Sequence, residues 1–253
     1  MTAYTNIGRR LELVAGLLDH EATTGRGMGV VSVAARVGRE KSQISRGLAA
    51  LANEGLVGRD RDSLEFSVGP ALLVLAAQAG EPELVRSALP VLERLGAVTG
   101  ERVDLAVLHD RQVLTIESIA SSSTVQSVGW VGRRTPLHCT AAGRVLLAAM
   151  PTSEVAALVG SSPLPPSGPN GPRSRAELMR RIDTARRDGW ALADGELDGD
   201  VMAIAAPIIA AEGGAVAAVM VSGPTFRMRS AVDAVVAAVR RAANELSPRQ
   251  DGV

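Results

Sequence analysis

The densest group of side chains able to make directed polar contacts lies between residues 39 and 61. It consists of Arg39, Lys41, Ser42, Gln43, Ser45 and Arg46, with Arg59 and Arg61 further along. Guanidinium, ammonium, amide and hydroxyl groups of this kind hydrogen-bond the base edges and phosphates of DNA. Arg46 and Gln43 suit base reading, because each can form paired hydrogen bonds with a purine. We assign Lys41, Ser42 and Arg39 to phosphates, and the two later arginines to the DNA backbone or the minor groove.

The apolar residues between these positions predict the elements that hold them. Residues 30–37 have the pattern of a short helix, and Gly38 supplies a turn. A second helix follows, with an apolar stripe (Ile44, Leu48 and Leu51) on the side away from the polar set. Residues 56–68 then alternate as a small β-hairpin, whose returning strand carries Leu64, Phe66 and Val68. This order predicts a winged helix-turn-helix, a module that enters the major groove of DNA.

Two more helices are expected around this module. Residues 9–20 place Leu11, Val14, Leu17 and Leu18 on one face, which predicts a helix that braces the other two. Residues 70–79 are apolar almost all round, so we expect this helix to be buried between domains or between subunits. The expected organisation is therefore a DNA-binding domain (1–69), a linker helix (70–81) and a second domain (82–253).

Composition restricts the class of protein. The chain has 253 residues, a length that suits two domains, and its 27 basic and 27 acidic side chains give no net charge. A basic coat over the whole surface is thus excluded. Between Arg36 and Arg61, however, there are six basic residues and three acidic ones, which makes a modest patch of positive charge. One cysteine, no secretory leader pattern and no long apolar run favour a cytoplasmic protein without a membrane span.

The second part of the chain has a different pattern. Strands are expected in pairs, with helices before, between and after them, which is typical of an α+β domain around an antiparallel sheet. The expected strands are 102–108, 112–120, 124–128, 190–194, 202–210 and 215–222, and the expected helices are 83–98, 141–150, 174–188 and 229–246. Thr140 is expected to cap the second of these helices, and Pro151 to mark its end.

Three patterns invite catalytic or metal-binding interpretations, and none is favoured. His138 and Cys139 are neighbours on an extended segment, so their side chains point to opposite faces and do not form a nucleophile–base pair. Three histidines and one cysteine lack zinc-ligand spacing. The acidic run 194–200 lacks the downstream glutamate of a calcium loop. We expect no enzyme activity, no cofactor and no metal, with Cys139 as a small core residue.

Five segments together carry a family resemblance. They are the paired-helix segment with NEGLVGRD, FSVGP, RRTPLHCTAAGRVLLA (133–148), IAAPI (204–208) and VAAVMVSGP (216–224). In this order they resemble the IclR-type bacterial transcriptional regulators, from about residue 5 to residue 246. The resemblance implies a winged helix-turn-helix, a linker helix used in dimerisation, and a C-terminal effector-binding domain similar to the GAF fold. It also implies binding to an operator in double-stranded DNA, as a homodimer or a dimer of dimers, under the control of a small metabolite.

The resemblance also implies where the metabolite binds. Effector contacts map onto Ala141, Ala142, Asp194, Ala203, Met220 and Ser222. Unpaired N–H groups at the start of the helix from residue 141 suit a carboxylate. Ala203 and Met220 stand where relatives often have hydroxyl or thiol groups, which favours a larger or more hydrophobic organic acid or aromatic ligand. Gln43 and Phe66 replace a common Thr and Tyr, so the operator cannot be copied from relatives.

Two rival functions remain open at this stage. The first is an enzyme whose second domain is catalytic, and it lacks a convergent acid–base or metal constellation. The second is a constitutive DNA-binding protein without an effector, in which the second domain serves assembly alone. The favoured hypothesis is a DNA-binding regulator in which effector binding shifts the spacing of paired N-terminal domains.

Overall fold

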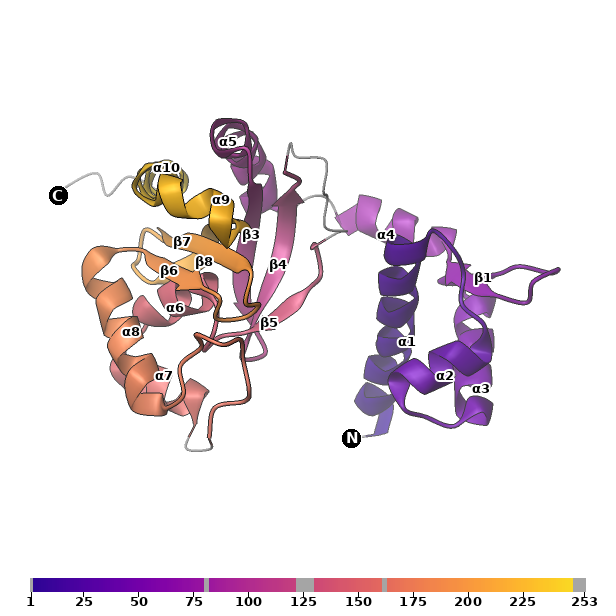
Figure 1. Ribbon diagram of the computed structural model, residues 1–253. Coiled ribbons are helices and arrows are strands. Elements are labelled where there is room, and N and C mark those ends of the chain that lie inside the picture. The colour runs from indigo at the N-terminus through magenta and orange to yellow at the C-terminus, as the bar shows by residue number, and fades with distance from the viewer. Residues whose placement is uncertain (1, 80–81, 122–129, 161–162, 248–253) are drawn as a thin grey trace. The chain divides into compact units, whose positions relative to one another are not determined.

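The computed structural model describes residues 2–79, 82–121, 130–160 and 163–247 (Figure 1). The chain divides into two compact units, Met1–Pro82 and Glu83–Val253, and each unit is described by itself. The strand expected at 124–128 lies outside the described residues. No helix among those described is long and apolar enough to cross a membrane.

The first unit is a helical module with a two-stranded wing. Its elements are α1 (Thr2–Thr24), α2 (Val30–Val37), α3 (Lys41–Asn53), β1 (Val57–Arg59), β2 (Phe66–Val68) and α4 (Pro70–Ala79). Gly38 ends α2 with a φ of 63°, a left-handed conformation that glycine adopts without steric cost. The strands β1 and β2 pair antiparallel, as the hairpin pattern predicts.

The core of this unit confirms the predicted apolar face of α3 and differs in part from the predictions for α1 and the returning strand of the wing. Ile44, Leu48 and Leu51 of α3 are buried as expected. In α1 the buried face is formed by Leu13, Val14 and Leu17, whereas Leu11 and Leu18 are exposed. The prediction was therefore right for Val14 and Leu17 and wrong for Leu11 and Leu18, because the apolar periodicity of this helix fits more than one face. Leu64 is also exposed and has a φ of 59°, so β2 starts only at Phe66.

The helix α4 starts at Pro70, as expected for a proline in the first turn. It is tied to the wing by two backbone hydrogen bonds, from Ala71 N to Gly55 O and from Gly69 N to Leu56 O. Beyond this attachment Leu73, Val74 and Leu75 are each more than half exposed. Within the first unit, these three side chains of α4 are therefore left uncovered.

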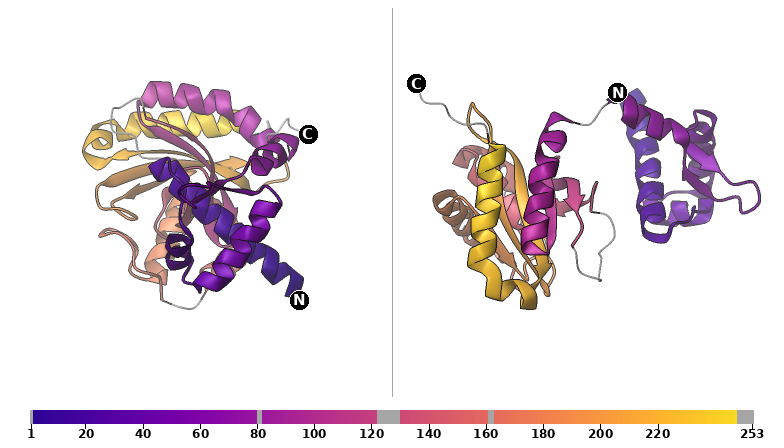
Figure 2. Two further views of the ribbon diagram at one scale, coloured as in Figure 1. Left: turned by 90° about the vertical axis from the view of Figure 1, so that its right-hand side faces the viewer. Right: turned by 90° about the horizontal axis from the view of Figure 1, so that it is seen from above.

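The second unit is a six-stranded antiparallel sheet covered by helices on both faces (Figures 1 and 2). The strand order is β5-β4-β3-β8-β7-β6. The strands are β3 (Arg102–His109), β4 (Gln112–Ile119), β5 (Arg134–Pro136), β6 (Ala191–Asp194), β7 (Val201–Ile209) and β8 (Ala215–Pro224). The helices are α5 (Glu83–Thr99), α6 (Ala141–Ala148), α7 (Thr152–Val159), α8 (Arg175–Asp188), α9 (Thr225–Met228) and α10 (Val232–Leu246). These observations confirm the predicted α+β class.

Each face of the sheet has its own core. On one face α5 and α10 bury residues such as Leu92, Leu105 and Val239. On the other face α6 and α8 bury a cluster that includes Ala141, Ala142 and Met220. The fold thus places four of the predicted effector residues, Ala141, Ala142, Ala203 and Met220, in or against one core cluster.

Four elements were not foreseen from the sequence. The first is α7: Pro151 follows the end of α6 at Ala148, as expected, and it also forms the N-cap of α7. The short strand β5, the short helix α9 and a 3-10 turn at Arg229–Ala231 complete the set. The Pro/Gly-rich loop before α8 has a definite role, because Asn170 covers the free edge of β6 by donating to Asp194 O at 3.0 Å.

Candidate functional site

The predicted DNA-contacting side chains form one exposed row on α3. Lys41, Ser42, Gln43, Ser45 and Arg46 are all exposed, while Ile44 between them is buried. Ser42 Oγ lies 3.4 Å from a carboxylate oxygen of Glu40, just before the helix. A row of donors on the solvent side of the second helix of this motif is the arrangement that reads a major groove.

The remaining predicted contacts lie at the two sides of this row. Arg39 is half-buried and paired with Glu12 of α1 at 3.1 Å, so a phosphate contact would compete with this ion pair. Arg59 and Arg61 are exposed on the wing, and the Arg59 guanidinium lies 5.4 Å from the ring centre of Phe66. The Asp60 carboxylate accepts hydrogen bonds from the backbone of Ser63 and Asp62, which lower the pKa of Asp60 and fix the wing turn.

The start of α6 is closely packed. Thr140 caps the helix as predicted: its Oγ1 accepts from Gly143 N at 3.2 Å and donates to Pro136 O at 2.9 Å. A Cβ on Gly143 would overlap the backbone of Leu137, so only glycine fits there. The cap uses the N–H of Gly143, which leaves those of Ala141 and Ala142 as the helix-start donors for a ligand. Both alanines are fully buried.

The register of the sheet brings three predicted effector residues onto one face. Ala203 pairs with Ser222 across β7 and β8, and Met220 pairs with Ala205 in the same ladder. Directly paired residues of antiparallel strands point to the same side. This side is the one covered by α6, because Ala205 and Met220 share the core cluster of Ala141 and Ala142.

Asp194 does not join this group. It pairs with Met202, which belongs to the core under α5 and α10 on the opposite face. Its carboxylate accepts from Thr225 Oγ1 at 3.0 Å and lies 3.1 Å from Arg229, so it anchors the start of α9. The residue of β6 that shares a side with Ala203 is Ala193, one position earlier. Alternation along the strand therefore separates Asp194 from the other five positions.

A buried polar row on β3 and β4 went unnoticed in the sequence. Asp104 is fully buried and pairs with Met220, while Arg102 pairs with Ser222. Arg102 donates to Asp104 at 3.1 Å and to Ser222 Oγ at 2.7 Å, and Ser118 Oγ donates to Asp104 at 2.6 Å. Burial raises the pKa of Asp104, and the Arg102 charge opposes this rise. In the sequence, Arg102 and Asp104 alternate with Val103 and Leu105, and this alternation could have predicted a polar side of the strand.

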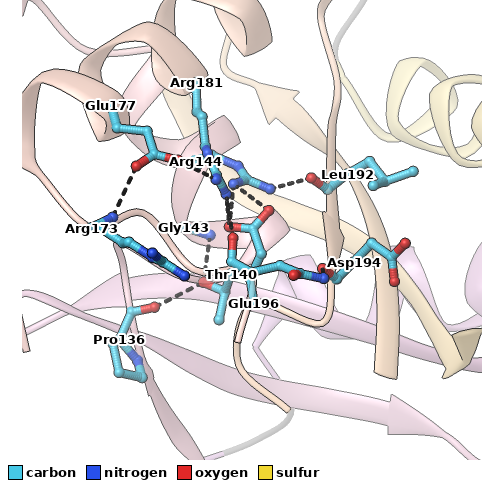
Figure 3. Close-up of polar contacts among 11 residues, drawn as sticks. Pro136, Thr140, Gly143, Arg144, Arg173, Glu177, Arg181, Leu192, Asp194 and Glu196 are labelled. Carbon is cyan, nitrogen blue, oxygen red and sulfur yellow. Dashed lines mark hydrogen bonds and ion pairs between the residues drawn. The ribbon is translucent and has the colours of Figure 1, made fainter. Parts of the chain in front are cut away.

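A second buried ion network joins α6, α8 and the segment after β6 (Figure 3). Arg144 is 2% exposed; its Nη1 lies 2.6 Å from Glu196 Oε2, and its Nη2 donates to Leu192 O. Arg181 lies 2.7 Å from the same Glu196 oxygen and 2.5 Å from Glu177 Oε1. The acidic run 194–200 thus supplies a structural counterion, Glu196, to a buried arginine.

Two hollows are found at the surface of the second unit, and neither is lined by a predicted effector residue. The larger, of about 470 Å³, lies beside α8 and β6 and is bordered by Arg144, Arg181, Trp190 and Glu196 among others. The smaller, of about 280 Å³, lies between the ends of α6, α8 and α10. The predicted effector residues Ala141, Ala142 and Met220 are buried in the core cluster under α6.

His138 and Cys139 are both buried. Burial raises the pKa of the Cys139 thiol to about 11, so the thiol stays protonated at neutral pH and is a poor nucleophile. Burial lowers the pKa of His138. One ring nitrogen of His138 bonds the Pro165 backbone, and Nε2 has no partner among the described residues. No group of three or more metal-ligating side chains occurs in the described part of the chain.

Comparison with known proteins identifies the class to which this architecture belongs. The family model for the C-terminal domain of the bacterial transcriptional regulator IclR matches residues 76–248. The HTH-type transcriptional regulator BhcR of Paracoccus denitrificans is 30% identical over 249 residues, which is 96% of this chain and 89% of that protein. The HTH-type regulator KdgR of Escherichia coli is 28% identical, over 88% of this chain and 85% of that protein.

Solved structures give the same result. An IclR regulator from Alicyclobacillus acidocaldarius has a TM-score of 0.80 at 26% identity, with 94% of this chain and 97% of that one covered. An IclR homologue from Microbacterium hydrocarbonoxydans, complexed with 4-hydroxybenzoate, has a TM-score of 0.78 at 28% identity, with the same coverage. This chain belongs to the IclR family of bacterial transcriptional regulators. It is a regulator of transcription and not an enzyme.

Proposed function

We propose that this regulator binds a specific operator in double-stranded DNA through the exposed donor row of α3. The proposed contacts are those named from the sequence, namely Arg39, Lys41, Ser42, Gln43, Ser45, Arg46, Arg59 and Arg61. One observation carries the proposal. On the second helix of a winged helix-turn-helix, the five polar side chains of residues 41–43, 45 and 46 are exposed, while Ile44 between them is buried. Acting on the chromosome, the protein would work in the cytoplasm.

The second unit is proposed to bind a small effector, an organic acid or an aromatic compound, and to assemble the protein. The 4-hydroxybenzoate complex of a homologue supports an effector of this kind. Ala141, Ala142, Ala203, Met220 and Ser222 are the proposed contacts, since α6 and one sheet face bring them together. Asp194 faces α9 and has a structural role in this proposal.

The exposed apolar side of α4 supports assembly as a homodimer or a dimer of dimers. Leu73, Val74 and Leu75 would be covered by a second copy, and α4 follows directly from the wing that contacts DNA. In this proposal residues 1–69 bind DNA, residues 70–81 link, and residues 82–253 sense the effector. Effector binding would shift the population of dimers with the half-site spacing that the operator requires.

The experiment is selection of operator DNA from a random duplex pool with the purified chain, followed by titration of the selected DNA. We expect enrichment of one sequence with two related half-sites, and a change in affinity on adding an organic acid or aromatic compound. Failure to enrich any sequence would overturn the operator function. Enrichment without any response across a broad panel of metabolites would leave a constitutive DNA-binding protein.

A further inference from the structure

The larger hollow of the second unit has a lining that the effector proposal does not use. This lining comes from one side of α8, from the edge strand β6 and from Arg144 of α6, and every lining residue belongs to the described part of the chain. Its volume of about 470 Å³ falls in the range of small-molecule pockets, which is about 300–1,000 Å³. None of the residues assigned to the effector lines it. The hollow is therefore a candidate for a separate binding site.

The charges around this hollow balance one another. Three arginines and three carboxylates line it, namely Arg144, Arg180, Arg181, Glu177, Asp188 and Glu196. Glu196 lies 2.6 Å from Arg144 and 2.7 Å from Arg181 (Figure 3). Arg181 also lies 2.5 Å from Glu177. The pKa of Glu177 is lowered by the hydrogen bond from Arg173 N and by the one from Arg181, so this carboxylate stays ionised. The network of two arginines and two glutamates thus has no net charge.

This balance selects against a charged ligand. A ligand carboxylate at Arg144 has to take the place of Glu196, and a ligand cation at Glu196 has to take the place of Arg144. Either exchange leaves one member of the pair without its partner. The side chains of this pair are only 3% and 6% exposed, so the abandoned charge would keep its desolvation cost. A neutral ligand leaves both charges paired.

The same lining offers hydrogen bonds of both kinds beside an apolar wall. The guanidinium groups donate and the carboxylates accept. A hydroxyl group does both, so several hydroxyls on one molecule match arginine and carboxylate groups that alternate along the lining. Such bonds are stronger than those between neutral groups, because one partner is ionised. The half-buried side chains of Trp190 and Leu192 supply apolar surface, and the flat indole suits the C–H face of a ring.

We infer that this hollow is a second small-molecule site and that its ligand is a neutral, hydroxyl-rich ring, a monosaccharide. Arg181 and Glu177 would bind its hydroxyls, Trp190 would contact its C–H face, and the Arg144–Glu196 pair forms the least exposed part of the lining. The inference goes beyond the proposed function, because the site shares no residue with the effector face. Arg144 nevertheless belongs to α6, the helix whose start carries Ala141 and Ala142.

The test compares sugars that share one skeleton and differ in charge. Glucose, galactose and mannose are each compared with the uronate and the amino sugar of the same skeleton. Kd is measured by calorimetry and Tm by thermal unfolding, on the full-length protein. We expect at least one neutral sugar to bind and to raise Tm, and its two charged counterparts to bind about tenfold or more weakly, because each displaces a member of the buried ion pair.

Two variants block the hollow from exposed positions of α8. Thr184→Trp and Asp188→Trp each place a large side chain in the hollow, because both residues line it and both are exposed. Ala234→Trp is the matched control, since Ala234 is exposed on α10 of the same unit and does not line the hollow. We expect both blocking variants to abolish sugar binding while the Tm of the free protein changes no more than in the control.

Three results would each overturn the inference. The first is a uronate or amino sugar that binds as tightly as its neutral counterpart. The second is sugar binding that survives both blocking variants, which would place the ligand elsewhere. The third is the absence of binding by all three neutral sugars. The operator and effector functions are tested separately by selection and titration of operator DNA, so they stand or fall independently of this result.

Discussion

Arg144 on α6 and Glu196 after β6 form an ion pair of 2.6 Å in which both side chains are almost completely buried. The guanidinium also bonds Leu192 O, so a single side chain ties α6 to the edge strand β6. Because Ala141 and Ala142 begin the same helix, the position of the proposed effector-binding residues depends on this pair. A buried charge tolerates the loss of its partner poorly, because the remaining charge keeps its desolvation cost.

Glu196→Gln should therefore lower the free energy of unfolding of the second unit by about 3–5 kcal/mol. Tryptophan fluorescence during urea titration measures this unit selectively, since Trp130 and Trp190 both belong to it. Glu83→Gln is the matched control, because the Glu83–Arg86 pair is largely exposed, and it should leave the midpoint in place. A midpoint for Glu196→Gln equal to that of the control would show that the buried pair contributes nothing.

Much of this architecture was predictable from the sequence, because it depends on local patterns. The Gly38 turn, the stripe of α3 and the Thr140 cap each follow from a few neighbouring residues, and the structure confirms them. The face of a helix or strand that becomes buried depends on distant partners. For that reason the predicted face of α1 included Leu11 and Leu18, which are exposed, and omitted Leu13, which is buried.

The candidate effector site shows the same limit more sharply. Asp194 and Ala193 differ by one position, but only the register of β6 against β7 decides which of them faces Ala203. Arg102 and Asp104 meet Ser222 across more than a hundred residues of sequence, so no local pattern connects them. The polar row of Arg102 and Asp104 on this face is therefore a finding of the structure that the sequence did not predict.

Arg46→Ala should weaken binding to the selected operator by about 1–3 kcal/mol while changing binding to random DNA much less, because its exposed guanidinium is placed to pair with a base edge. Titration of both duplexes by fluorescence anisotropy at one salt concentration measures the two affinities. Lys41→Ala is the comparison, since a phosphate contact should weaken both duplexes alike. Equal losses for Arg46→Ala would make Arg46 a phosphate contact as well.

Leu73→Glu should reduce the oligomeric state, because it places a charge on the exposed apolar side of α4, where Leu73 is 72% exposed in the single chain. Light scattering after gel filtration gives the mass, and operator titration gives the affinity. Val31→Glu is the matched control for mass, since Val31 is similarly exposed on α2 of the same unit. An unchanged mass and affinity for Leu73→Glu would exclude α4 as the subunit contact.

His138→Gln should flatten the loss of stability on the acid side. Burial holds the pKa of His138 below its ordinary value of 6.5 in the folded chain, so the unfolded chain takes up the proton more readily. The wild-type stability is then fully present above about pH 6.5 and falls as the pH drops through 6.5 towards the folded pKa. Tm measured between about pH 5 and pH 8 should fall less steeply for His138→Gln, even if its Tm at pH 8 is lower. A slope for His138→Gln as steep as that of wild type would assign the acid sensitivity to other groups.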